Sequence, residues 1–323
     1  MKFICAQPAI DYYTWQVEVM INNFIKNGAN PNDIQIVCAH HGTVSEKWQK
    51  LAKGYPEVKF FFYFDGRQKP CYISSVRPYV LYEHWLKHPE LQKETVFYHD
   101  CDIVFSKPID FEGLLDNDTC YVSDTVSYIG AQYVRSKGEH YLDFMADIVN
   151  VNKQYIIEQE KNSGGAQYIL KNIPLEFWKK VYYDAENLYR LITHQIEKDK
   201  MDNPSMHEIQ IWCADMWAVL WNLWFWDKQV EVTDKLSFSW ATSHINDWDK
   251  HPIFHNAGVT GDFDGLFYKG KFQLSLPYDE VKEKTYNSNF CSSKYAEEIL
   301  KTGEVTCLKD RKSTRLNSSH LGI

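Results

Sequence analysis

Two aspartates separated by one residue, Asp100 and Asp102, are the side chains of this sequence most suited to chemistry. They follow an apolar run (96–98) whose composition predicts a buried strand of a mostly parallel sheet. Side chains two residues apart on a strand point to the same side. We therefore expect both carboxylates at one spot on the C-terminal edge of the sheet, where open α/β sheets bind their ligands.

Two converging carboxylates in an apolar setting are costly unless a cation neutralises them. Hard divalent cations take oxygen ligands, so the pair predicts a divalent metal site. A structural alternative stays open, in which Asp100 opens a turn and Asp102 caps a neighbouring segment.

The first hundred residues predict the sheet that positions this pair. Apolar runs at 3–6, 34–38 and 58–64 read as strands, and helical spacing at 15–26 and 75–86 reads as helices. Alternation of strand and helix implies parallel strands with right-handed crossovers. We expect an α/β fold: a single domain with a mixed, mostly parallel central sheet flanked by helices. The sequence has no GxGxxG or GxxxxGK[ST] loop to hold a phosphate.

The pattern beyond Asp102 is mixed. Residues 162–173 read as a glycine-opened loop that runs into a helix, 209–226 as a buried helix and 278–301 as a polar helical segment. Residues 182–200 are polar and have no clear assignment. Trp217, Trp221 and Trp224 fall on one helical face and favour core packing over sugar stacking.

Composition excludes several classes of protein. The 323 residues carry a formal net charge of −8 with no basic stripe, which argues against a nucleic-acid partner. No apolar run is long enough for a transmembrane segment. The N-terminus lacks a secretory signal pattern, so we expect a cytoplasmic location. The eight cysteines include no C-x-x-C pair and are expected to be reduced thiols.

The chain is expected to have three parts. Residues 1–275 form the predicted α/β domain, and 276–309 form a polar, helical extension that is truncated. Residues 310–323 can be reverse-translated into a sequencing adapter, so this segment is interpreted as a non-native scar and is excluded from functional reasoning.

The sequence 97–109 resembles the D-x-D segment of GT-A-fold glycosyltransferases, in which an apolar strand, D-x-D and further apolar residues precede a short loop. Three other pieces follow the usual order of that superfamily: Arg77 before the segment, 163–167 (SGGAQ) after it, and 254–258 (FHNAG) near the end. Glycogenin-like and peptidyl arabinosyl- or galactosyltransferase enzymes are the suggested relatives.

The resemblance implies a GT-A-like, Rossmann-related domain and an enzyme. It would be a metal-dependent hexosyl- or pentosyltransferase that moves a sugar from a nucleotide diphosphate donor, a UDP-sugar, to a glycan, protein or small-molecule acceptor. Asp100, Asp102 and His255 would hold the metal. The imidazole favours Mn²⁺ over Mg²⁺, although His255 could instead be a buried structural histidine. Stereochemistry stays open, with retention weakly favoured.

The same resemblance implies donor contacts at several positions. The first strand would end at the nucleotide base, Arg77 and Asp100 would face the donor, paired glycines would approach the sugar, and a lysine-rich turn would bind the diphosphate. Each position also has a structural alternative as a surface, loop or turn residue. The implied donor-binding residues are Gln7, Pro8, Arg77, Asp100, Gly164, Gly165, Lys269, Gly270 and Lys271.

Two residues are candidates for the reacting side. Asp215 lies in an apolar run (212–221), where a carboxylate would be desolvated and needs a partner. It would orient the acceptor or act as a base, and helix capping is its alternative. Gln167 could hydrogen-bond to sugar hydroxyls or the reacting face.

Other functions remain as alternatives. A sugar-nucleotide nucleotidyltransferase of the same fold would need a basic, glycine-rich loop after the first strand, and 5–10 (CAQPAI) has neither feature. A catalytically inactive sugar- or nucleotide-binding module would retain the same scaffold. A non-enzymatic interaction protein has no specific support in the sequence.

Overall fold

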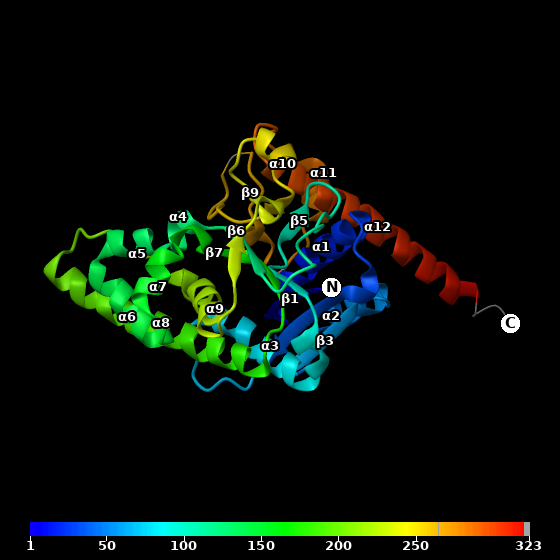
Figure 1. Cartoon of the computed structure of the whole chain (residues 1–323). Coiled ribbons are helices and arrows are strands. Elements are labelled where there is room, and N and C mark those ends of the chain that lie inside the picture. The colour runs from blue at the N-terminus through cyan, green and yellow to red at the C-terminus, as the bar shows by residue number, and fades with distance from the viewer. Residues whose placement is uncertain (264, 320–323) are drawn as a thin grey trace.

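The computed structural model describes the backbone of residues 1–263 and 265–319, and the side chains of this part up to residue 306. A seven-stranded sheet with the order β3-β2-β1-β4-β7-β6-β8 forms its centre (Figure 1). Strand β7 is antiparallel to both of its neighbours, and the other neighbouring pairs are parallel. The strands are β1 Lys2–Pro8, β2 Ile34–His40, β3 Lys59–Phe64, β4 Val96–His99, β6 Cys120–Asp124, β7 Gly164–Leu170 and β8 Val230–Val232. The predicted α/β class with a mixed, mostly parallel sheet is confirmed.

Helices cover both faces of this sheet because its strands are apolar on both sides. Along β1, Phe3 and Cys5 pack in a cluster with residues of α1 and α2, whereas Ile4 and Ala6 pack with α3, α8 and α9. Such alternation follows from the two-residue period of a strand. The covering helices are α1 Thr14–Lys26, α2 Glu46–Gly54, α3 Val76–Lys87, α8 Leu175–Asp202 and α9 Ala214–Phe225.

A second sheet has three short strands, in the order β5-β10-β9. These are β5 Ile103–Phe105, β9 Phe238–Trp240 and β10 Ile253–His255; β10 is antiparallel to β5 and parallel to β9. Val104 and Phe254 of this sheet pack in one cluster with Trp15 of α1 and Tyr295 of α12 (Ser292–Ser319). The small sheet thus joins segments from the middle and the end of the chain.

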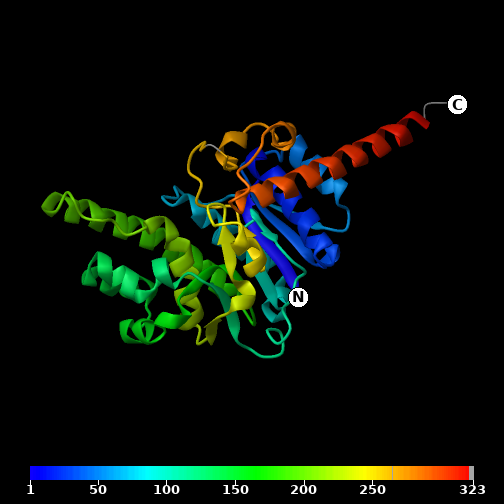
Figure 2. The ribbon, with the colours of Figure 1, turned by 90° about the horizontal axis from the view of Figure 1, so that it is seen from above.

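The remaining helices gather at two ends of the molecule. Figures 1 and 2 show α5, α6 and α8 on the side opposite to α12, which extends beyond the body of the protein. The segment 276–309, expected to be a helical extension, contains α11 and most of α12. Side chains of the proposed adapter segment 310–323 lie outside the described residues, as do the backbone positions 320–323. The helices not yet given are α4 Val126–Ile129, α5 Ala131–Lys137, α6 Glu139–Val149, α7 Lys153–Glu158, α10 Asn246–Lys250 and α11 Tyr278–Glu283.

One prediction about local structure was wrong. Residues 162–173, expected to be a loop leading into a helix, contain strand β7 between β4 and β6. Glycine is required here for close approach: a Cβ on Gly164 would lie 2.3 Å from Val122 Cγ2 and 2.4 Å from the Ser123 carbonyl oxygen. The run 168–170 is buried and supplies the rest of the strand.

Two segments in the second half of the chain are helical in the structure. The unassigned segment 182–200 lies within the 28-residue helix α8. The predicted buried helix 209–226 contains α9, and Trp217, Trp221 and Trp224 are core residues. Across the described part of the chain, no helix combines the length and apolar character needed to cross a membrane. The cysteines whose side chains are described are free thiols.

Candidate metal centre

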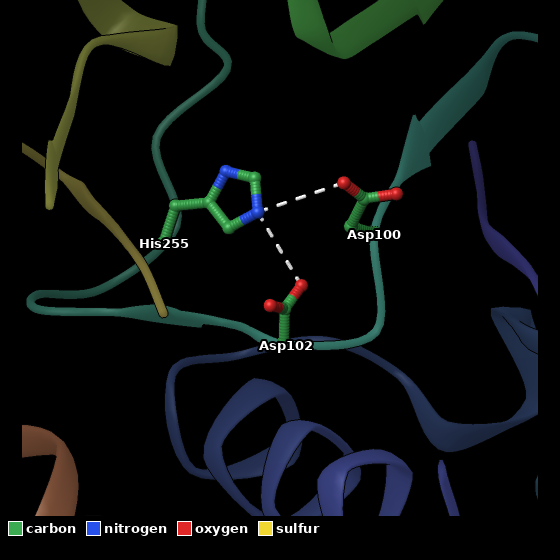
Figure 3. Close-up of side chains that lie close together, drawn as sticks. All are labelled: Asp100, Asp102 and His255. Atoms are coloured by element: carbon green, nitrogen blue, oxygen red, sulfur yellow. Dashed lines mark ion pairs between the residues drawn. The ribbon is translucent and has the colours of Figure 1, made fainter. Parts of the chain in front are cut away.

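The structure brings the three predicted metal ligands together (Figure 3). Asp100 and Asp102 lie in the turn between β4 and β5, and His255 is the last residue of β10. His255 Nε2 lies 3.5 Å from Asp100 Oδ2 and 3.4 Å from Asp102 Oδ1. One ligand atom from each residue falls within 4.8 Å of the other two. The side chains therefore converge as ligands of one ion would.

Strand pairing explains how His255 reaches residues so far away in the sequence. Strand β10 pairs with β5 so that His255 is opposite Ile103, the residue after Asp102. The N–H of Asn256 then donates to the carbonyl of Asp102 at 2.9 Å. Trp240 of β9 stacks on the imidazole, with ring centroids 5.5 Å apart and an interplanar angle of 20°. Backbone pairing and ring packing together orient this histidine.

The charge of Lys269 decides the protonation state of Asp102. Burial by itself raises the pKa of this carboxyl, but the Lys269 ammonium beside it holds the pKa below its usual value. Lys269 forms an ion pair with Asp102 Oδ2. Burial lowers the pKa of Lys269 as well, and the Asp102 carboxylate more than offsets this, so the net shift is upward. Asp102 is thus an ionised ligand at neutral pH.

This donor set suits a divalent cation. Two carboxylates offer the oxygen ligands that Mg²⁺ and Mn²⁺ take, and Mn²⁺ also accepts an imidazole nitrogen. Asp102 and His255 are 6% and 7% exposed, so their charge and lone pair have little water to stabilise them. Asp100 is more exposed and leaves one side of the cluster open.

Arg77, at the start of α3, connects this cluster with Asp215. Its Nη1 donates to Asp100 Oδ1 at 2.6 Å, and its Nη2 forms an ion pair with Asp215 Oδ2. The hydroxyl of Tyr72 lies 2.6 Å from the other oxygen of Asp215, Oδ1, and 2.5 Å from the Trp212 carbonyl oxygen, and its single hydrogen is shared between these two acceptors. Both oxygens of Asp215 are therefore occupied. The N-cap of α9 is Cys213, so Asp215 lies in the first turn of that helix.

The two predicted glutamines, Gln167 and Gln7, lie on different strands, β7 and β1. Gln167 is fully buried in β7 and faces Nδ1 of His255, at 3.5 Å, and Ser123 of β6. Gln7 lies near the end of β1, which pairs in parallel with β4 and therefore ends beside the aspartate turn. Its amide nitrogen contacts Cys38 Sγ at 3.1 Å, and its Oε1 has no hydrogen-bond partner among the described residues.

The remaining predicted donor-binding residues lie at the end of β1, at the start of β7 and in a short 3₁₀ helix. Pro8 ends β1 beside Gln7. Gly164 and Gly165 begin β7, and a Cβ on Gly165 would lie 2.8 Å from both Met216 Cε and the Tyr168 hydroxyl. Gly270 follows Lys269 in a short 3₁₀ helix (Lys269–Phe272). Lys271 of that helix instead pairs with Glu280 of α11 at 2.7 Å.

Sequence reasoning missed several residues that contact the predicted ones, among them Tyr72 and Ser123. Tyr72 binds Asp215, and Ser123 binds Gln167. Neither lies in a pattern with recognisable spacing, because each contact spans many residues of the chain. Because a buried carboxylate needs hydrogen-bond donors, a partner for Asp215 could have been expected, but the sequence does not indicate that this partner is Tyr72.

Comparisons with known proteins give likeness in structure alone. No family model matches the chain, and no curated protein matches its sequence. Among solved structures, the galactosyltransferase LgtC in complex with donor and acceptor sugar analogs aligns with a TM-score of 0.45 at 10% identity, over 93% of this chain and 95% of that one. The bifunctional glycosyltransferase WbbM gives 0.44 at 12% identity, over 94% of this chain and 51% of its own. This chain thus spans about half the length of WbbM. Mouse xyloside xylosyltransferase 1 gives 0.39 at 10% identity, over 79% and 96%.

Proposed function

We propose that this protein is a metal-dependent glycosyltransferase that takes a sugar from a nucleoside diphosphate donor. The observation that carries the proposal is the cluster itself: Asp100, Asp102 and His255 converge at the C-terminal ends of parallel strands, beside two cationic side chains. That edge is where open α/β sheets bind ligands. A divalent cation and two basic groups in one place suit a substrate with several negative charges.

The cation would be Mn²⁺ or Mg²⁺, held by Asp102, Asp100 and His255. When bound, it would stabilise the negative charge that grows on a leaving diphosphate. Lys269, now on Asp102, is positioned to take a phosphate oxygen as partner, and Arg77 holds Asp100 toward the cation. The chain itself would thus supply the metal ligands, a positive charge beside the diphosphate, and a guanidinium that holds Asp100 in place.

The donor is proposed to be a UDP-sugar. Gln7, whose carboxamide oxygen has no partner in the described residues, would accept the ring N–H of a uracil beside Pro8. Gly164, Gly165 and Gly270 pack closely against Val122, Met216 and Tyr268, so their proposed role is to hold these segments together beside the donor, and Lys271 would add positive charge near Lys269. The acceptor is proposed to be a glycan, a protein or a small molecule.

Asp215 is proposed to act on the acceptor side through Arg77. Its two oxygens bind Tyr72 and Arg77, so it fixes the direction of the guanidinium that also holds Asp100. A base for inverting transfer would have to be free of such contacts at the moment of reaction.

Titration calorimetry with UDP, with and without Mn²⁺, tests the proposal on the full chain. We expect binding only with Mn²⁺, and its loss in Asp102→Asn. Asp110→Asn is the matched control, because this aspartate also pairs with a lysine, Lys235 at 2.9 Å, but is 63% exposed and lies outside the cluster.

A screen of UDP-sugars for Mn²⁺-dependent release of UDP completes the test. Nucleotide binding without turnover of any sugar would favour an inactive binding module. A folded wild type that binds no UDP under either condition would contradict the proposal, as would full Mn²⁺-dependent turnover in Asp102→Asn.

A further inference from the structure

The buried contacts of Gln167 contain a conflict that determines how its amide is oriented. In the structure, Gln167 Oε1 lies 2.6 Å from Ser123 Oγ, and Gln167 Nε2 lies 3.5 Å from His255 Nδ1. Ser123 Oγ also lies 2.7 Å from the backbone carbonyl of Leu236. The residues Gln167, Ser123 and His255 are at most 7% exposed, so water does not substitute for a missing partner.

A serine hydroxyl has one hydrogen and cannot donate to two acceptors at once. The carbonyl of Leu236 can only accept, so the hydrogen of Ser123 belongs there. Toward Gln167 the hydroxyl must then accept, and the amide group facing it must be the NH₂. The oxygen and nitrogen of a carboxamide can be exchanged by a half-turn of the amide. That half-turn removes the conflict.

The half-turn also determines which nitrogen of His255 carries the proton. With the carboxamide oxygen facing Nδ1, the imidazole must donate from Nδ1. Hydrogen bonds then run in one direction: His255 Nδ1–H to Gln167, Gln167 N–H to Ser123, and Ser123 O–H to the Leu236 carbonyl. A neutral imidazole with its proton on Nδ1 has its lone pair on Nε2, the nitrogen that faces Asp100 and Asp102.

We propose that Gln167, held by Ser123, is a positioning residue that fixes His255 in the Nδ1–H tautomer and so directs its Nε2 lone pair at a divalent cation. The inference deepens the proposed function and rests on its metal site. A lone pair 3.4 Å from a buried carboxylate oxygen is unfavourable unless a cation lies between them. Hydrogen bonds to the far nitrogen of a ligating histidine commonly change metal affinity 10- to 100-fold.

The tautomer can be read directly from the ¹⁵N chemical shifts of the histidine side chains, measured on the full chain with Zn²⁺, a diamagnetic divalent cation that accepts imidazole. His99 is an internal reference, because its Nδ1 lies 2.9 Å from a backbone carbonyl, that of Asp100, which can only accept. We expect His255 to show the Nδ1–H pattern of His99. Its signal is identified by its loss in His255→Gln. An unprotonated Nδ1 on His255 would overturn the inference.

Two variants of Gln167 distinguish this role from simple packing. Gln167→Met keeps the size of the side chain but removes the acceptor, so we expect Mn²⁺ affinity, measured from the EPR signal of the free ion, to fall at least about tenfold. Gln167→Glu keeps an oxygen facing Nδ1 but loses the donor toward Ser123, so it should lower Mn²⁺ affinity less than Gln167→Met does. A packing role predicts the reverse order, because a buried carboxylate is costlier than a thioether.

These readouts separate failure of the inference from failure of the proposed function. Mn²⁺ binding with the expected tautomer and variant order, but no turnover of any UDP-sugar, would reject the transferase and leave the inference standing. Mn²⁺-dependent turnover with wild-type Mn²⁺ affinity in Gln167→Met would overturn the inference alone. If Gln167→Glu does not fold, the tautomer of His255 in the wild type still distinguishes the positioning role of Gln167 from simple packing.

Discussion

Replacing Lys269 by glutamine should destabilise the cation-free protein, because it removes the counter-charge of a buried carboxylate. Asp102 is 6% exposed, and Lys269 forms an ion pair with its Oδ2. Removing one partner of such a pair costs about 3–5 kcal/mol. The Lys269 side chain is 27% exposed, so solvent screens part of this ion pair. We therefore expect about 3 kcal/mol.

Urea unfolding followed by tryptophan fluorescence, with a chelator present, measures this loss. Lys271→Gln is the matched control: the lysine lies in the same short helix and pairs with Glu280, but it is exposed and should change the unfolding midpoint little. Asp102→Asn combined with Lys269→Gln should recover much of the lost stability, because no unpaired charge then remains.

A divalent cation should replace the missing ammonium. A ligand at 100 times its dissociation constant stabilises the folded state by about 2.7 kcal/mol. Lys269 competes for Asp102 only in the wild type, so Mn²⁺ alone should stabilise Lys269→Gln more than it stabilises the wild type. Equal stability of wild type and variant without cation, or an equal gain from Mn²⁺ in both, would refute the reasoning.

Three further predictions concern stability in urea. Arg77→Met leaves Asp215, whose side chain is 9% exposed, without its cation and should lower the free energy of unfolding by about 3 kcal/mol. Adding Asp215→Asn should restore part of this loss. A double variant no more stable than Arg77→Met would contradict the reasoning. Gly164→Ala forces a Cβ against the backbone of β6 and should lower the free energy of unfolding by about 2 kcal/mol. Gly261→Ala, whose Cβ would have its nearest contact at 3.6 Å, should lower it less. Similar urea midpoints for the two variants would contradict the packing of β7 on β6. Burial lowers the pKa of His84 to about 3, so between pH 6.5 and 3 the unfolded chain binds a proton that the folded chain does not. From pH 7 to 5 this should remove about 2 kcal/mol of stability, and His84→Gln should lose less over the same range.

The sequence allowed the central sheet to be predicted because its signals are local. Runs of apolar residues on β1, β2 and β3, separated by helical spacing, identify parallel strands without knowledge of their neighbours. Strand β7 was missed because its first two residues are glycines, which are typical of loops. Their reason is tertiary: Gly164 lets β7 approach Val122 and Ser123 of β6, and no local pattern encodes that contact.

Residues 253–254 read as a strand, but the assembly of the short second sheet could not be predicted from the sequence, for a related reason. Strands β5, β9 and β10 have three residues each, too few for a period to be recognised. Asp100 and Asp102 could be read as a metal pair from their spacing, since the two residues are neighbours. His255 could be joined to them only through a family resemblance, because its place depends on the register of β10 against β5.

The hydrogen bonds behind the proposed metal ligands, made by Gln167 and Ser123, are the part of the site that is hardest to predict from a sequence. A metal ligand must be one of a few residue types, so Asp100, Asp102 and His255 stand out as candidates. A residue that sets the proton of a ligand needs only one hydrogen-bonding atom, and most polar residues have one. Ser123 therefore does not stand out in the sequence, and Gln167 stands out only through the family resemblance. The role proposed for them rests on distances of 2.6 and 3.5 Å across strands β6, β7 and β10. If these hydrogen bonds set the affinity for the cation, substitutions that conserve every ligand can still remove metal binding, and the ligand motif alone will not identify which chains are active.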